Sequence, residues 1–266
     1  MSQIPPYQQP PGYSNYPRNP SGQSYQRPPG VYFENIGDAW NLVQKNLSTW
    51  ILTMLICGAM YFAVVFAVEM ILVISTTSLS GVGPARTIAP SLSILLIAIP
   101  VFLIIACVFQ VIFAGLMMMA VKQARGEPIS IGDAFSHFPD IVSIVIAGFL
   151  SALAIGIGTL CCLVPGLWLT GIFVFVPMLA ADRKLGPIEV LELSYNTLRP
   201  YAWPLFALHF VANLIGSAGM ALCGVGMLIT FPIYVSIMGL AYNNFFPKQV
   251  QDNYVYNQPI GFEPPR

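Results

Sequence analysis

Residues 93–120 read SILLIAIPVFLIIACVFQVIFAGLMMMA, and this stretch contains no charged side chain. A helix needs about 20 predominantly apolar residues to cross the hydrocarbon core of a bilayer, so this stretch is long enough to span a membrane. Five further apolar stretches lie at about 50–74, 141–163, 166–181, 201–222 and 224–245. We therefore predict an all-α membrane protein with six transmembrane helices.

The composition of the whole chain agrees with a membrane protein. Of its 266 residues, 56% are hydrophobic and only 8% are charged, and the mean hydropathy is +0.71. Soluble domains carry about a quarter of charged residues, so this composition excludes a soluble enzyme. Eleven basic side chains balance eleven acidic ones. This balance gives no support for a nucleic-acid partner.

Two polar segments flank the apolar region, and we predict that both are disordered tails. Residues 1–30 are rich in Pro, Tyr and Gln and contain no aliphatic side chain after Ile4. Such a segment cannot bury enough apolar surface to offset the entropy cost of ordering it. Residues 247–266 have a similar composition, which leaves 31–246 as the membrane domain. The Pro-Pro-Gly-Tyr sequence at 10–13 matches the ligands of WW domains, so the first tail is either a docking segment for a cytoplasmic protein or a flexible tether.

The distribution of basic residues predicts the orientation of the spans. With six spans, both tails lie on the same side of the membrane. The side opposite the tails carries Arg86 alone. The tail side carries Arg18, Arg27, Lys45, Lys122, Arg125, Arg183, Lys184, Arg199, Lys248 and Arg266. Because Lys and Arg are enriched in cytoplasmic loops, we predict that both termini are cytoplasmic.

A threefold repeat is visible in the segments on the tail side. Ile-Gly-Asp-Ala occurs at 36–39 and again at 131–134, and each copy continues with the spacing i, i+4, i+7, i+11 of one helix face. A third copy lacks the Gly-Asp pair. The three faces are Ile36, Trp40, Val43 and Leu47; Ile131, Phe135, Phe138 and Val142; and Leu191, Tyr195, Leu198 and Ala202. We predict three units, each an interfacial amphipathic helix followed by a transmembrane hairpin.

An alternative with four spans stays open. The 166–181 stretch is short, and Pro177 interrupts its regular part. Together with 141–163 it forms either two full spans or one re-entrant hairpin.

The region 130–245 resembles a family of bacterial six-helix integral membrane proteins of unknown function. The residues that carry the resemblance are Val-Pro-Met-Leu at 176–179, Asp182, Leu-Gly-Pro-Ile-Glu at 185–189 and Leu-Ser-Tyr-Asn at 193–196. Val-Pro-Gly at 164–166 and Gly-Val-Gly-Met-Leu at 224–228 fit it too. The same group includes the membrane domain attached to some glycerophosphodiester phosphodiesterases. The resemblance implies a multi-pass protein of the bacterial inner membrane and supplies no catalytic residues. The chain ends shortly after the last span, so we do not expect phosphodiesterase activity.

Polar side chains inside the predicted spans are functional candidates, because such groups are costly in hydrocarbon. Gln110, His209 and Asn213 form the candidate intramembrane polar site. They serve either as hydrogen-bonding contacts between the second and fifth spans or as a small binding site for a lipid headgroup or ion. Glu69 lies near the outer surface, where it either forms a solvated charge pair with Arg86 or acts as a gate or proton site.

The cysteines and the common enzyme motifs add little to the prediction. Cys161, Cys162 and Cys223 fall in predicted outer turns, where they either form one disulfide or serve as small apolar turn residues. A lone transmembrane His lacks the partners of a metal site. The chain contains no Gly-x-Ser-x-Gly, no His-Glu-x-x-His and no paired intramembrane aspartates. We therefore predict no enzyme, no catalytic, metal or cofactor-binding residues, and no cofactor.

Two functions remain in view. The first is a non-catalytic membrane organiser or scaffold that contacts membrane lipids and recruits a cytoplasmic partner through its N-terminal tail. The alternative is a transporter or lipid-handling protein with a small polar site inside the membrane. Internal repeats are common in transporters, but here all three predicted hairpins enter from the same side. The oligomeric state has no signature in the sequence.

Overall fold

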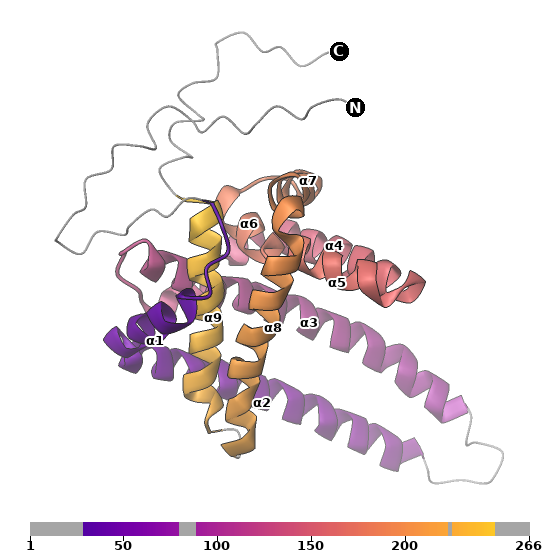
Figure 1. Ribbon diagram of the computed structural model, residues 1–266. Coiled ribbons are helices and arrows are strands. Elements are labelled where there is room, and N and C mark those ends of the chain that lie inside the picture. Colours follow the sequence, from indigo (N-terminus) through magenta and orange to yellow (C-terminus); the bar gives the residue numbers. More distant parts are fainter. Residues whose placement is uncertain (1–28, 80–88, 223–224, 248–266) are drawn as a thin grey trace, which may run out of the picture.

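The computed structural model describes residues 29–79, 89–222 and 225–247, and every regular element within these ranges is a helix (Figure 1). Arg86 and almost all of the two predicted disordered tails (1–28 and 248–266) lie outside the described residues. The α-helices are α1 (Asn35–Lys45), α2 (Leu47–Leu79), α3 (Ala89–Ala124), α4 (Ile141–Cys161), α5 (Leu163–Phe173), α6 (Val176–Arg183), α7 (Pro187–Leu198), α8 (Ala202–Ala218) and α9 (Met227–Phe245). Short 3-10 helices are η2 (Ile131–Phe135), η3 (Phe138–Asp140), η4 (Arg199–Tyr201) and η5 (Gly219–Leu222).

Four helical segments in the described residues are long and apolar enough to cross a membrane. They are Leu47–Ile71, Ile99–Ala124, Ile131–Cys161 and Leu163–Arg183. The prediction of an all-α protein with membrane-length helices is therefore confirmed. The fourth segment is α5 followed directly by α6, and Pro177 lies within the first two residues of α6. Proline fits there because the first backbone N–H groups of a helix have no partner inside the helix.

The last two predicted spans form helices, α8 and α9, but neither reaches the length and apolar character of the other four. Helix α8 has 17 residues. Helix α9 has 19 residues and includes Pro232, Asn243 and Asn244. Its buried residues run along most of its length, from Pro232 to Phe245. Polar side chains in a membrane bundle are tolerated where they face protein rather than lipid, and the enclosed position of α9 fits its weaker hydropathy.

Helix α9 is the centre of the bundle. It packs against α1, α2, α3 and α8, and Figure 1 shows α8 and α9 side by side. Helices α2 and α3 extend away from this centre as a long pair (Figure 1). Their outer parts expose large apolar side chains, among them Phe62, Phe66, Phe102, Leu103 and Ile104. An apolar surface of this extent fits a lipid environment better than water.

Two hydrogen bonds of the Gln123 side chain join α1, α2 and α3. The indole Nε1 of Trp50 donates to Oε1 of Gln123 at 2.9 Å, and Nε2 of Gln123 donates to the carbonyl oxygen of Leu42 at 2.6 Å. Trp50 is fully buried. Both polar atoms of the Gln123 amide thus have a partner, which removes the cost of burying them.

Two of the three predicted repeat segments fold as helices, while their position at a membrane interface stays a prediction. Helix α1 covers the first copy except Leu47, which begins α2. It packs against α9, buries Asn35, Ala39 and Val43, and leaves Trp40 exposed. Helix α7 covers most of the third copy and buries Val190, Ser194 and Leu198.

The prediction of an amphipathic α-helix is wrong for the second copy, which folds as η2 and η3. Ser130 immediately precedes η2, and its backbone N–H donates to the carboxylate of Asp133 at 2.7 Å. Pro139 follows a few residues later, and proline disfavours helical geometry in the residue before it. Gly132, Pro139 and the local hydrogen bond of Asp133 together favour tight turns over a regular helix.

Helices α5 and α8 approach each other closely at a glycine. A Cβ atom at Gly171 in α5 would overlap the carbonyl oxygen of Ala202, at the start of α8. By contrast, Gly156 in α4 has no atom within 4 Å of the position that a Cβ would take. The close contact therefore depends on glycine at 171, in the way that small residues let membrane helices approach.

We expect Gly171→Ala to destabilise the protein by about 1–3 kcal/mol, because the backbone of α8 must move to admit the methyl group. Gly156→Ala is the matched control. It should be neutral or stabilising by up to about 1 kcal/mol, since alanine is the better helix former. Thermal unfolding of the two purified variants in one detergent checks this. Equal midpoints would contradict the close approach.

Candidate functional site: a polar cavity between the helices

A cavity of about 230 Å³ lies where α3, α4, α5, α6, α8 and α9 converge. A cavity of roughly 150 Å³ already holds benzene, so this one has room for a larger group. Most of its lining is apolar. The lining residues are Gln110, Phe113, Met117, Gly148, Ser151, Ile155, Thr170, Phe173, Val174, Pro177, Met178, His209, Tyr234 and Met238.

Gln110, predicted as a site residue, lines this cavity from α3. Its Nε2 donates a long hydrogen bond of 3.4 Å to the carbonyl oxygen of Ile144 in α4. The amide fits there because residue 148, one turn further along α4, is a glycine. A Cβ at that position would overlap Nε2 of Gln110. The amide oxygen of Gln110 has no hydrogen bond to any described residue.

His209, the second predicted site residue, reaches the same cavity from α8. Its Nε2 lies 3.0 Å from Nδ2 of Asn213, one turn further along the same helix. When that amide donates to Nε2, the ring proton lies on Nδ1. Nδ1 is buried and has no hydrogen-bond partner among the described residues.

The structure thus brings Gln110 and His209 to one cavity without the hydrogen bond that we expected between them. Gln110 bonds to the backbone of α4, and His209 bonds within its own helix. Asn213 is exposed and does not line the cavity. Its link to the cavity is the hydrogen bond with Nε2 of His209.

Sequence reasoning missed Tyr234, which lines the cavity from α9 beside His209. The two rings meet edge to face, with centroids 6.0 Å apart. The phenol hydroxyl forms no hydrogen bond within the described part of the chain. Tyrosine is grouped with the hydrophobic residues when apolar stretches are identified, so the hydroxyl of Tyr234 did not mark it as a polar residue within a span. Its position at the centre of a predicted span is the only clue that could have found it.

The remaining polar groups of the cavity are already satisfied. Ser151 Oγ donates to the carbonyl oxygen of Gly148 at 2.8 Å, and Thr170 Oγ1 donates to that of Gly166 at 2.9 Å. The uncommitted groups are therefore the Gln110 oxygen, the His209 Nδ1 and the Tyr234 hydroxyl. Three methionines and two phenylalanines surround them. Methionine side chains adapt to ligands of irregular shape, so this lining suits a mainly apolar molecule with one polar group.

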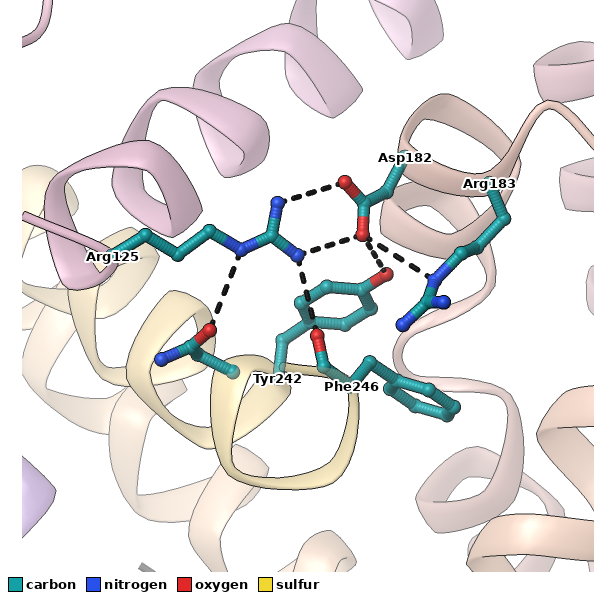
Figure 2. A network of polar contacts seen from close by, with 6 residues as sticks. Arg125, Asp182, Arg183, Tyr242 and Phe246 are labelled. Carbon is teal, nitrogen blue, oxygen red and sulfur yellow. Dashed lines mark hydrogen bonds and ion pairs between the residues drawn. The ribbon is translucent and has the colours of Figure 1, made fainter. Parts of the chain in front are cut away.

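A second polar cluster, also missed from the sequence, lies at one end of the bundle (Figure 2). Arg125 follows α3, and its guanidinium binds the Asp182 carboxylate of α6 through two hydrogen bonds of 2.9 and 2.8 Å. The hydroxyl of Tyr242 in α9 donates to Asp182 Oδ2 at 2.8 Å. Arg125 also donates to the carbonyl oxygen of Phe246 at 3.2 Å and to Asn243 Oδ1 at 3.4 Å. The cluster thus joins α3, α6 and α9.

The charges of Arg125 and Asp182 are paired. The side chains of Arg125 and Asp182 are only 9% and 8% exposed. Burial lowers the pKa of Arg125, but the hydrogen bonds and the negative charge of Asp182 outweigh it, so the pKa is raised overall. The guanidinium therefore keeps its charge. A bidentate pair of this kind fixes geometry as well as charge, which fits a structural role.

Other predicted site residues are not brought together within the described residues. Glu69 is exposed on α2, and its predicted partner Arg86 lies outside the described ranges. Cys161 and Cys162 are exposed free thiols, while Cys223 is not described, so the disulfide stays a prediction. Among the described residues, no group of three or more His, Cys, Asp or Glu side chains could hold a metal ion.

The fold and the cavity define an all-helical protein with membrane-length helices around a small, mostly apolar cavity. Comparisons with known proteins find distant relatives. The chain is 27% identical over 248 residues to the uncharacterised protein Rv2560 of Mycobacterium tuberculosis strain H37Rv, covering 86% of this chain and 74% of the relative. It matches the uncharacterised protein Mb2590 of Mycobacterium bovis to the same extent.

No protein-family model matches the chain, and no solved structure is significantly similar to it. The resemblance to the six-helix membrane family therefore stays a prediction. The relatives' names state no activity, so the functional argument depends on the cavity itself.

Proposed function

We propose that this protein is a non-catalytic, multi-pass membrane protein that binds a small amphiphilic molecule in the cavity between α3, α4, α5, α6, α8 and α9. The observation that carries the proposal is the meeting of Gln110, His209 and Tyr234 at one cavity, each with an uncommitted polar atom. Of these three atoms, Nδ1 of His209 is the one that is fully buried. An unpaired buried polar atom costs about 1–3 kcal/mol, which a ligand with a hydrogen-bonding group would recover.

The lining also indicates the chemical class of the ligand. None of the side chains that line the cavity is an acid, a lysine or an arginine. A charged group there would lose its hydration without gaining a partner of opposite charge. We therefore infer a neutral, mainly apolar ligand, such as part of a lipid, with one group that exchanges hydrogen bonds with His209 and Tyr234. This is the lipid-handling alternative rather than the scaffold, whose docking tail lies outside the described residues.

We further propose that α8 and α9 also cross the membrane, which gives six spans with both termini in the cytoplasm of a bacterial cell. The central position of α9 supports this, because a helix packed against α2 and α3 lies at the same depth as those membrane-length helices. The basic residues support the orientation, since Lys122, Arg125, Arg183 and Lys184 all lie where candidate spans end.

Native mass spectrometry tests the binding proposal directly. The full-length protein is extracted with its surrounding lipid, and the masses that stay bound are recorded as activation increases. We expect one defined molecule per chain in the wild-type protein. The double variant Gln110→Leu with His209→Leu should lose it, because it removes two of the three hydrogen-bonding groups.

Matched controls carry the same substitutions outside the cavity. Gln44 is exposed on α1, and His137 lies before η3, away from the lining residues. The double variant Gln44→Leu with His137→Leu should therefore retain the ligand. Retention by the Gln110 and His209 variant, in folded protein, would refute the binding site. Loss in both variants would point to a general loss of folding.

Thiol labelling tests whether α8 and α9 cross the membrane. In a background free of native cysteines, Val225→Cys reports on the connection between α8 and α9, where Val225 is exposed. A membrane-impermeant maleimide should label it in intact cells if both helices cross. Lys184→Cys, at an exposed position directly after α6, should be labelled only after lysis. Labelling of both positions only after lysis would mean that α8 and α9 do not cross.

A further inference from the structure

Arg183, the last residue of α6, is a second arginine beside the Asp182 carboxylate. Its Nε lies 3.6 Å from Asp182 Oδ2, which is too long for a hydrogen bond. That oxygen already accepts from Arg125 and from Tyr242. The Nε of Arg183 is buried and has no hydrogen-bond partner among the described residues.

The local charge is therefore unbalanced. Asp182 is the only carboxylate within 4.0 Å of Arg183 in the described part of the chain, and it is fully engaged by Arg125. Among the described residues, two guanidinium groups therefore share one carboxylate, and one positive charge has no carboxylate of its own. The Arg183 side chain is only 14% exposed. A largely buried cation without a full partner is costly, and a bound anion would relieve that cost.

The orientation of Arg183 leaves its outer nitrogens available. The guanidinium lies 5.9 Å from the centroid of the Phe246 ring. Its two terminal nitrogens point away from Asp182 (Figure 2), and neither forms a hydrogen bond to a described residue. Two N–H groups along one edge of the planar guanidinium match the geometry of two phosphate oxygens. Lys184, which follows directly and is exposed, adds a second positive charge.

The position along the chain suits a phosphate at the membrane surface. Arg183 ends the candidate span Leu163–Arg183, so it lies where hydrocarbon gives way to headgroups. Basic pockets between helices at this level bind anionic headgroups.

We propose that Arg183 is the anchor of a phosphate-binding site at this end of the bundle, with Arg125 and Asp182 as the framework that holds it. The phosphate belongs either to a lipid headgroup or to a free phosphate ion. The site is separate from the cavity, because none of its residues lines that cavity.

Lipid retention by the full-length protein tests the site. Native mass spectrometry compares phosphatidic acid with diacylglycerol of the same chains, a pair that differs only in the phosphate. Wild-type protein should retain phosphatidic acid about tenfold more strongly. Arg183→Gln should abolish this preference, and Arg183→Lys should keep part of it, because a lysine retains the charge but not the paired N–H groups.

Arg199→Gln is the matched control, since Arg199 is an exposed arginine that begins η4, shortly after α7. It should leave the preference unchanged.

Competition with inorganic phosphate separates the two sources of phosphate. Displacement of phosphatidic acid indicates a site for free phosphate, and no displacement indicates a lipid headgroup. The proposal is overturned if wild-type protein retains neither phosphatidic acid over diacylglycerol nor inorganic phosphate, or if Arg183→Gln matches the wild type. The Gln110 and His209 variant should keep this preference, so the two proposals fail independently.

Discussion

Arg125→Gln should lower the free energy of unfolding by about 3–5 kcal/mol, because the buried Asp182 carboxylate loses its bidentate partner and keeps only Arg183, whose Nε lies 3.6 Å away, beyond hydrogen-bond distance. Asp182 would then keep the hydrogen bond from the Tyr242 hydroxyl and the longer contact with Arg183. Neither replaces the two hydrogen bonds from Arg125. The carbonyl oxygen of Phe246 would also lose its donor. The variant should therefore loosen the contacts among α3, α6 and α9.

Lys122→Gln is the matched control for this prediction. Lys122 lies one turn earlier, and its Nζ is 2.6 Å from Asp133 Oδ1, but its side chain is 35% exposed. Such partly solvated pairs contribute about 0–1 kcal/mol. Unfolding of both variants in mixed micelles, with increasing denaturing detergent, measures the difference. Equal losses of stability would mean that the Arg125 pair is not buried as described.

Trp50→Ala should cost about 3–5 kcal/mol, the range for truncation of a buried large aromatic side chain. Trp50 is fully buried and donates to Gln123. Its removal leaves both a void and a buried amide oxygen without a donor. Trp50→Phe separates the two effects, because it fills most of the void but still removes the hydrogen bond. It should therefore cost less than Trp50→Ala and more than zero.

The control for this series is Trp203→Ala, on α8. Trp203 is 48% exposed and contacts Phe206 edge to face, with ring centroids 6.3 Å apart. Its truncation should cost about 1 kcal/mol or less. The same detergent titration reports all three variants. A Trp203 variant as unstable as Trp50→Ala would show that burial does not set the cost of removing these indoles.

The membrane class and most helix positions could be predicted from the sequence, because long apolar runs have few alternative folds. The predicted stretch 93–120 lies inside α3, and 141–163 begins at the first residue of α4. The break near Pro177 was also visible. Hydropathy could not show that α9 is the central helix, since its burial depends on which neighbours surround it.

The second amphipathic copy illustrates where periodicity fails. Ile131, Phe135 and Phe138 have helical spacing, yet the segment folds as two 3-10 helices. The hydrogen bond from the Ser130 backbone to Asp133 favours a tight turn there. The repeated pattern of apolar residues therefore predicted a helix, whereas local hydrogen bonding gave the segment a different backbone.

The candidate site could be predicted only in part. Gln110 and His209 were visible as polar residues inside apolar stretches, and the structure places both at one cavity. Their partners were not visible: Gln110 bonds to a backbone carbonyl that becomes accessible only because residue 148 is glycine. Arg125 and Asp182 are 57 positions apart, and single-sequence patterns carry no signal for a pair at that distance.

The central position of α9 has a consequence for the order in which the protein assembles. Translation runs from the N-terminus, so α9 is the last of the described helices to leave the ribosome. Until it arrives, α1 lacks its packing surface, and Asp182 lacks the Tyr242 hydroxyl. The earlier helices therefore cannot complete the bundle before α9 is made. A ribosome that stalls before residue 227 would leave a chain without the helix that contacts α1, α2, α3 and α8.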